Sequence, residues 1–233
     1  MRDWKTFWNT DPLNYKDNEY MKQVGYTVNG QPISDLLFRQ ILSEISQHLQ
    51  LSPDDVVLDL CCGNGLVTKE IAKISRSVVG VDYSTPLINI ARKEHQPDNV
   101  RYLQMSVLDL TPEAIGHDEP FTKVYMYGAL QHFRPDELLT ILTTILELSR
   151  DEVIILFGSV PDKSRLWKFY NTAARRFDFI KRTLEGREAI GTWWDKRLIQ
   201  RICDRMGRRC EFLQQHTMLH TSHYRFDVRI TLS

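Results

Sequence analysis

A hydrophobic run that ends in small residues is the clearest chemical signal in this sequence. Residues 56–65 read VVLDLCCGNG, which is typical of a buried strand that passes into a glycine-containing turn and then a helix. Small side chains let the backbone approach a ligand closely, and a helix N-terminus offers unpaired N–H groups. The spacing is not the GxGxxG of dinucleotide sites, and no GK[ST] follows as in a phosphate-binding P-loop. We therefore predict a ligand site of a different class at this strand end.

An acidic residue closes the next hydrophobic run. Residues 78–84 read VVGVDYS, in which Asp82 follows Asp59 by 23 positions. A carboxylate at the end of a neighbouring parallel strand can accept hydrogen bonds from both hydroxyls of a ribose. The alternative is that Asp82 caps the helix that follows. Because both strand ends occur together at this spacing, we favour the ribose role.

The two motifs resemble the class I, Rossmann-like S-adenosylmethionine-dependent methyltransferases, and the resemblance extends over about residues 50–160. That family has a strand followed by (D/E)xGxGxG, with Cys61 here in the place of the first glycine. The resemblance implies S-adenosylmethionine as the cofactor, with Asp59 near its methionine part and Asp82 at its ribose. The cofactor-binding residues implied for these motifs are Asp59, Cys61, Gly63, Gly65, Asp82 and Tyr83.

Two further stretches extend the resemblance. Residues 99–110 correspond to the family's third strand and its adenine-contacting loop, and Ser106 stands where many members have an acid. Ser106 and Val107 are therefore the predicted adenine contacts. Residues 121–133 correspond to the fourth strand and the loop after it, where Leu130-Gln131-His132 replaces a common Leu-His-His.

Tyr127 and His132 are the residues predicted to act during catalysis. Ligands of an open α/β sheet bind beyond the carboxyl ends of its strands, so this loop should face the transferred methyl group. Methyl transfer needs mainly alignment of donor and acceptor, and a base is required where the acceptor must lose a proton. His132 can take that proton, or it can pack against the helix expected after it. Tyr127 is also a candidate for binding the cofactor.

Alternating strands and helices must position these residues, which predicts an α/β fold. The last segment alternates strictly between apolar and polar residues, which is typical of a half-exposed antiparallel strand. We predict a seven-stranded, mostly parallel sheet with helices on both faces and an antiparallel last strand. The strands are expected at 56–60, 78–82, 100–103, 124–126, 153–157, 210–213 and 224–232. The helices are expected at 34–49, 66–74, from 85 onward, 135–148 and 195–206, with Ser34, Thr85 and Asp195 as N-caps.

Two segments lie outside this alternation. Residues 1–33 are rich in aromatic side chains at no helical or strand spacing, and we predict an arm that caps the cleft. The methyltransferase domain is then expected over 34–233, with an insertion at about 161–192 that forms a second cap. Residues 161–190 carry a net charge of +4, which indicates an anionic acceptor such as a carboxylate, a phosphate or a sugar nucleotide. The alternative is a solvated helix face.

Composition limits the partners. The chain has 30 basic and 30 acidic residues, so no overall positive field is available to bind a nucleic-acid backbone, and no nucleic-acid module is recognised. The cysteines have no CxxC spacing, and no metal site is predicted. The sequence has no signal-peptide run and no span of about 18 apolar residues, so we expect a cytoplasmic protein without a membrane partner. The oligomeric state is not predicted.

The leading hypothesis is a methyltransferase that acts on a small-molecule acceptor. Oxygen is favoured over nitrogen, because a hydroxyl must lose a proton and His132 can accept it. Anionic and sugar-like acceptors are the classes considered. The alternatives are a protein or RNA methyltransferase that docks through the basic insertion, and a catalytically inactive module that binds S-adenosylmethionine.

Overall fold

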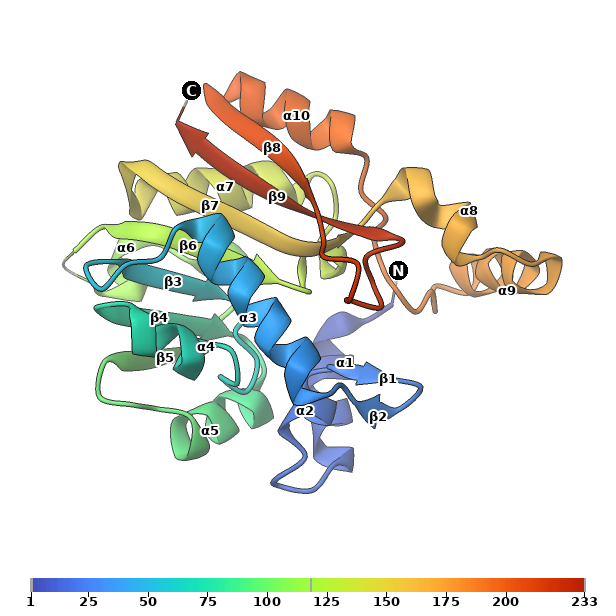
Figure 1. Cartoon of the computed structure of the whole chain (residues 1–233), viewed down its shortest axis with the longest axis horizontal. Coiled ribbons are helices and arrows are strands. Elements are labelled where there is room, and N and C mark those ends of the chain that lie inside the picture. Colours follow the sequence, from blue (N-terminus) through green and yellow to red (C-terminus); the bar gives the residue numbers. More distant parts are fainter. Residues whose placement is uncertain (1, 118, 233) are drawn as a thin grey trace.

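The computed structural model describes residues 2–117 and 119–232, and within them it has a central seven-stranded sheet (Figure 1). The strands lie in the order β5-β4-β3-β6-β7-β9-β8. Their bounds are β3 Val56–Leu60, β4 Ser77–Asp82, β5 Val100–Gln104, β6 Phe121–Tyr127, β7 Ser149–Pro161, β8 Arg208–Gln214 and β9 Arg225–Leu232. The strands from β5 to β7 pair in parallel, which confirms the predicted α/β class and mostly parallel sheet.

The last strand is antiparallel, as predicted, but it does not have the exposed face expected for it. β9 pairs with β7 on one side and β8 on the other, so β8 forms the edge of the sheet. Phe226 and Val228 are fully buried, and so is the polar Asp227, while Arg225 is 8% exposed. The alternation in the sequence therefore marks buried polar groups at the start of the strand and not a solvent-facing surface.

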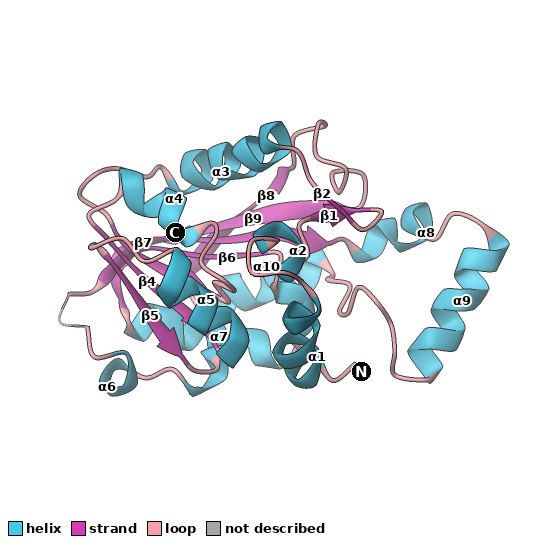
Figure 2. Cartoon of the chain, turned by 90° about the horizontal axis from the view of Figure 1, so that it is seen from below, coloured by secondary structure: helices cyan, strands magenta, loops and turns pink. Residues whose placement is uncertain are grey.

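Helices cover both faces of the sheet (Figure 2). Along β3, Val57 packs with the helices of one face, and Leu58 packs with those of the other, because successive strand residues point in opposite directions. All five residues of β3 are buried, as expected for a strand that is covered twice. One face carries α3 Asp35–Leu49, α4 Thr68–Ile71 and α5 Thr85–Glu94. The other carries α6 Pro112–Ile115, α7 Glu137–Glu147 and α10 Lys196–Arg205.

Two of the three predicted N-caps are confirmed. The Ser34 hydroxyl accepts a hydrogen bond from Leu37 N at 3.3 Å, and the Asp195 carboxylate accepts one from Arg197 N at 2.9 Å. The prediction of Thr85 is wrong by one residue, since Ser84 caps α5. The Asp82 carboxylate binds Ser84 N and holds Ser84 in an extended conformation, so the cap lies one residue earlier than the sequence suggests. The helix expected at 66–74 is divided into α4 and a 3₁₀ turn, Ala72–Ile74.

The N-terminal segment is more regular than its sequence pattern indicates, and it is fastened to the loop after β4. Its elements are α1 Trp4–Thr10, the 3₁₀ helix Asp11–Asn14, α2 Tyr20–Gln23, β1 Thr27–Val28 and β2 Gln31–Pro32. The Tyr83 hydroxyl donates to the carbonyl of Trp4 at 2.8 Å, and the Ser84 hydroxyl donates to the carbonyl of Trp8 at 2.7 Å. α1 is therefore held directly beside the end of β4.

The segment after β7 also contains helices that were not predicted. β7 runs on to Pro161, and it is followed by the 3₁₀ turn Lys163–Arg165, α8 Leu166–Phe169 and α9 Ala173–Leu184. Figures 1 and 2 show that α8 and α9 project away from the sheet. Among the described residues, no helix combines the length and the apolar character needed to cross a membrane. The domain boundary at residue 33 stays a prediction.

Candidate active site

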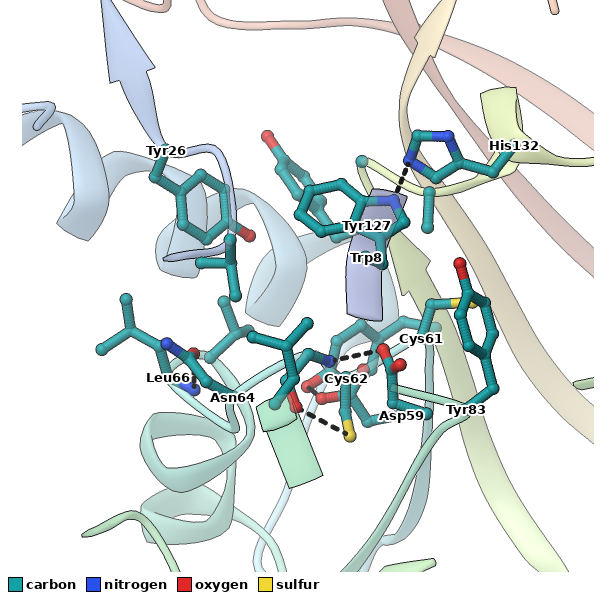
Figure 3. Close-up of a pocket in the computed structure, with 18 of the residues that line it drawn as sticks. Trp8, Tyr26, Asp59, Cys61, Cys62, Asn64, Leu66, Tyr83, Tyr127 and His132 are labelled. Atoms are coloured by element: carbon teal, nitrogen blue, oxygen red, sulfur yellow. Dashed lines mark hydrogen bonds between the residues drawn. The ribbon is translucent and has the colours of Figure 1, made fainter. Parts of the chain in front are cut away.

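A cleft lies at the carboxyl ends of β3, β4 and β6, and we refer to it as the cofactor cleft (Figure 3). The turn after β3 and the end of β4 form one wall, and the N-terminal segment contributes Trp8, Val24 and Tyr26 to another. Most of the predicted site residues meet here although they come from distant parts of the sequence. Those that line the cleft are Asp59, Cys61, Gly63, Asp82, Tyr83, Tyr127 and His132.

The turn after β3 requires left-handed backbone at three positions. Cys61, Gly63 and Gly65 have φ values of 59°, 56° and 77°. This conformation costs an L-residue about 1–2 kcal/mol, so a glycine at position 61, as in the family motif, would adopt it without strain. Gly65 is not in the wall of the cleft, and it lies against Tyr102 of β5. A Cβ atom on Gly65 would clash with the Tyr102 hydroxyl oxygen, so the turn and β5 pack without space for a side chain.

The Asp82 carboxylate connects the two predicted strand ends. Its Oδ2 accepts a hydrogen bond from Gly63 N at 2.9 Å, and its Oδ1 accepts one from Ser84 N at 2.8 Å. Each oxygen keeps a lone pair for a ligand, so the contact with the following helix does not exclude the ribose role. Burial raises the pKa of Asp82 to about 6, against the lowering effect of these N–H donors.

Asp59 lies deeper and is held by two hydroxyl groups. Its Oδ2 accepts hydrogen bonds from Thr68 Oγ1 and from Tyr125 Oη, both at 2.6 Å. Burial raises the pKa of Asp59 to about 7, although these hydrogen bonds lower it and Asp82 raises it further. The carboxylate is therefore poised to change its charge near neutral pH when a cation enters the cleft.

Asn64 is a residue that the sequence analysis did not single out, although it stands between the two glycines of the motif. Its side chain is fully buried and donates to the carbonyl of Tyr20 and to Gln23 Oε1, both at 2.9 Å. These contacts join the turn after β3 to α2. The same residue therefore shapes the cofactor cleft and holds the N-terminal segment in place.

The two predicted adenine contacts, Ser106 and Val107, do not appear in the wall of the cofactor cleft. The Ser106 hydroxyl accepts a hydrogen bond from Leu108 N at 3.2 Å and caps the short 3₁₀ helix Val107–Asp109. Val107 is buried in the core beneath the sheet. Their contact with an adenine stays a prediction.

His132 lies under aromatic side chains of α1. The Trp8 indole N–H donates to His132 Nε2 at 3.3 Å (Figure 3), and the Trp4 ring centroid lies 4.2 Å from that of the imidazole. Because Nε2 accepts, the proton of the neutral ring belongs on Nδ1, which is buried and has no hydrogen-bond partner in the described chain. Burial, assisted by Arg225 and Arg2, lowers the pKa of His132 to about 3, so the ring is neutral at physiological pH.

A second cavity adjoins the cofactor cleft, and we refer to it as the acceptor cavity. Its volume is about 290 Å³. The two spaces share wall residues at their junction, namely Trp8, Val24, Tyr26, Tyr127, Gly128 and His132. The insertion contributes Ala189 and Ile190 to the acceptor cavity, but none of its basic side chains lines it. The cations in this wall are Arg2 and Arg225, which the sequence analysis did not identify.

Part of the chain is similar to known methyltransferases. Residues 57–152 match the methyltransferase domain family. The chain is 31% identical over 122 residues to magnesium-protoporphyrin O-methyltransferase of Rhodobacter capsulatus, an alignment that covers 51% of this chain and 52% of that protein. It is 28% identical over 125 residues to 23S rRNA (uracil(1939)-C(5))-methyltransferase of Photorhabdus laumondii, covering 52% of this chain and 27% of that protein. The chain thus spans about half, or less, of the length of these relatives.

A solved methyltransferase structure has a similar fold over nearly the whole chain. Magnesium protoporphyrin IX methyltransferase from Synechocystis PCC 6803 with bound S-adenosylhomocysteine has a TM-score of 0.64 at 13% identity, covering 99% of this chain and 98% of that one. Residues 57–152 are thus similar to a methyltransferase domain, and the chain shares the fold of a methyltransferase that binds S-adenosylhomocysteine. Both likenesses support the predicted methyltransferase class and S-adenosylmethionine as the predicted cofactor. The left-handed turn at Gly63 and two carboxylates that face one cleft fit that cofactor.

The packing of Gly65 against Tyr102 gives a stability prediction. Gly65→Ala should lower the free energy of unfolding by about 2–4 kcal/mol, because the substitution adds both a strained φ and a steric clash. Gly30→Ala is the matched control, since Gly30 has a φ of 75° but a Cβ added there would meet no atom within 4 Å. It should cost about 1 kcal/mol. Urea unfolding measures both variants, and equal losses would contradict the proposed packing.

The raised pKa of Asp59 predicts pH-dependent cofactor binding. A cationic ligand favours the carboxylate, so binding should release a proton below the pKa of about 7. Affinity for S-adenosylmethionine, whose sulfonium is positively charged, should therefore increase from pH 5.5 to pH 8 by about tenfold and then level off. Isothermal titration calorimetry in two buffers of different ionisation enthalpy measures the affinity and the protons released. A constant affinity over this range, with no proton release, would rule out titration of the cleft carboxylates.

Proposed function

We propose that this protein transfers a methyl group from S-adenosylmethionine to a hydroxyl oxygen of a small molecule. The observation that carries the proposal is the junction of the two cavities at Tyr127, Gly128 and His132. A volume of about 290 Å³ suits a small ligand, since small-molecule sites measure roughly 300–1,000 Å³. The O-methyltransferase named among the relatives supports oxygen as the accepting atom.

The wall of the acceptor cavity supports a small acceptor over a macromolecule. α1 covers the junction with Trp4 and Trp8, and it is fastened by Tyr83 and Ser84. A protein or RNA acceptor would have to displace this helix to reach the methyl group. The two relatives cover similar parts of this chain, but the alignment with the rRNA methyltransferase covers 27% of that protein, against 52% of the O-methyltransferase. The likeness to the rRNA enzyme therefore supports the cofactor and does not identify the acceptor.

His132 is the proposed base. When bound, S-adenosylmethionine would supply a methyl group from its positively charged sulfur, which would keep the electron pair of the C–S bond as the methyl group bonds to the acceptor oxygen. His132 Nε2 takes the hydroxyl proton of the acceptor, and its Nδ1 already carries the other ring proton. The ring is neutral at physiological pH and Nε2 has a lone pair, but a pKa of about 3 makes His132 a weak base, so the proposed role requires that acceptor binding raise this pKa.

Trp8 must release His132 before that proton transfer. Its indole N–H donates to Nε2, the atom that the acceptor hydroxyl would need. We therefore propose that the entering acceptor replaces Trp8 as the hydrogen-bond donor to His132. Until the acceptor binds, the hydrogen bond from Trp8 keeps His132 in the tautomer with its proton on Nδ1.

The proposed function is tested with a panel of phenols, amines and carboxylates, together with total RNA and total protein. Release of S-adenosylhomocysteine and the mass of the product identify the acceptor. We expect turnover with hydroxyl compounds and O-methyl products. Methylation of RNA or protein alone would replace the proposal with the macromolecular alternative. Tight binding of S-adenosylhomocysteine without turnover on any acceptor would instead support an inactive binding module.

The role of His132 predicts a kinetic defect without loss of cofactor binding. His132→Ala should reduce kcat by about 10²-fold or more, which is the contribution typical of a positioned base. The affinity for S-adenosylhomocysteine should change by less than about threefold, because the carboxylates and the glycine turn are unaltered. His117→Ala is the control, since His117 lies after α6 and outside both cavities. Full turnover by His132→Ala would assign His132 a packing role.

A further inference from the structure

The acceptor cavity has positive charges in its wall and no negative ones. Among the described residues that line it, Arg2 and Arg225 are charged, and none is Asp or Glu. The chain as a whole has equal numbers of basic and acidic residues, so this excess is a property of the cavity. A cavity with cations alone favours an anionic occupant.

Arg225 is buried and incompletely hydrogen-bonded. It is 8% exposed, and its Nη1 donates to the carbonyl of Ser159 and, at 3.4 Å, to Gln131 Oε1. Its Nε is buried and has no partner in the part of the chain that the structure describes. None of the ion pairs found among those residues includes Arg225. A buried guanidinium without a carboxylate partner is costly in a free protein.

The acid two residues further along the same strand does not neutralise it. Asp227 Oδ1 accepts hydrogen bonds from Ser159 N at 2.8 Å and from Gln215 Nε2 at 3.0 Å. Its Oδ2 lies 3.4 Å from His48 Nδ1. Asp227 Oδ2 has no hydrogen-bond partner among the described residues. None of the contacts of Asp227 found among those residues is with Arg225, so no ion pair there compensates the charge of Arg225.

We propose that Arg225 binds an anionic group of the acceptor, a carboxylate or a phosphate ester carried on an aromatic or apolar body. The inference rests on the proposed function and adds the class of its substrate. The planar guanidinium suits either anion, because it can form two parallel N–H···O bonds. The neighbouring wall is apolar and aromatic, with Trp4, Phe7 and Tyr224, and it matches the body of such a molecule.

The position of Arg225 also connects anion binding to the proposed base. Gln131, which accepts from Arg225, is adjacent to His132 in the chain, and the Arg225 charge contributes to the low pKa of His132. An anion on Arg225 offsets that charge and so raises the pKa of His132 toward its ordinary value. An anionic acceptor thus makes its own base stronger, whereas a neutral acceptor does not.

The test measures binding of small probes to the full chain saturated with S-adenosylhomocysteine. Calorimetry compares benzoate and phenyl phosphate with benzamide, which is neutral and close to benzoate in shape. We expect one or both anions to bind at least tenfold more tightly than benzamide, and their ranking distinguishes a carboxylate from a phosphate site. Equal binding of all three probes, or no binding of either anion, overturns the inference.

Variants of Arg225 assign the binding to this residue. Arg225→Gln should lower the affinity for the more tightly bound of the two anions by at least tenfold, while the affinity for benzamide stays the same. Arg225→Lys keeps the charge without the planar fork, and it should weaken anion binding by about three- to tenfold. Arg229→Gln is the matched control on β9, since Arg229 pairs with Glu211 away from the cavity. The affinity of each variant for S-adenosylhomocysteine shows whether that variant is folded. If Arg225→Gln does not fold, Arg225→Lys is the variant whose anion affinity tests the inference.

The two proposals fail in different ways. Methylation of neutral hydroxyl compounds, with anions excluded, would overturn the role of Arg225 and leave the proposed function intact. Anion binding that depends on Arg225, without turnover on any acceptor, would support the anion site and overturn the proposed methyl transfer. Wild-type anion affinity in both Arg225 variants would overturn the assignment of the site to this residue.

Discussion

The rest of the site depends on the hydrogen bonds that the Asp82 carboxylate accepts from Gly63 N and Ser84 N. They hold the turn after β3 against the end of β4, and they set the residue at which α5 is capped. Asp82 is 8% exposed, so these donors compensate part of the cost of burying its carboxylate. The same group that organises the protein backbone therefore faces the cleft with unused acceptor capacity, which an adenosine can satisfy.

The N-terminal segment extends this organisation to the acceptor side. Asn64 in the glycine turn binds α2, and Tyr83 and Ser84 at the end of β4 bind α1. Each of these contacts joins a cofactor-binding loop to the segment that covers the junction of the two cavities. α1 and the wall of the acceptor cavity are thus attached to the same loops that line the cofactor cleft, and Trp8 on α1 donates a hydrogen bond to His132.

The parts of the fold that were predicted well have strong local signals. The five residues of β3 and the capped helix α3 could be identified because burial on both faces and helical periodicity leave clear patterns. The segments predicted poorly depend on distant contacts. β9 alternates like a half-exposed strand, yet Arg225 and Asp227 at its start are buried, and Asp227 finds partners from other elements. α1 is short, and its contacts with the loop after β4 hold it in place.

The sequence by itself determined the cofactor side of this protein, because a left-handed turn and an acid at two strand ends must be encoded locally by glycine and aspartate. It also identified Tyr127 and His132 as neighbours of that site through their place after the fourth strand of the parallel sheet. The acceptor side was decided by the tertiary structure alone. Arg2, Trp8 and Arg225 come from opposite ends of the chain and carry no shared motif, and they meet because the antiparallel β9 enters the sheet beside β7 while α1 closes over the strand ends. The burial of Arg225 without an ion-pair partner among the described residues is also a tertiary feature, and no local sequence pattern indicates it.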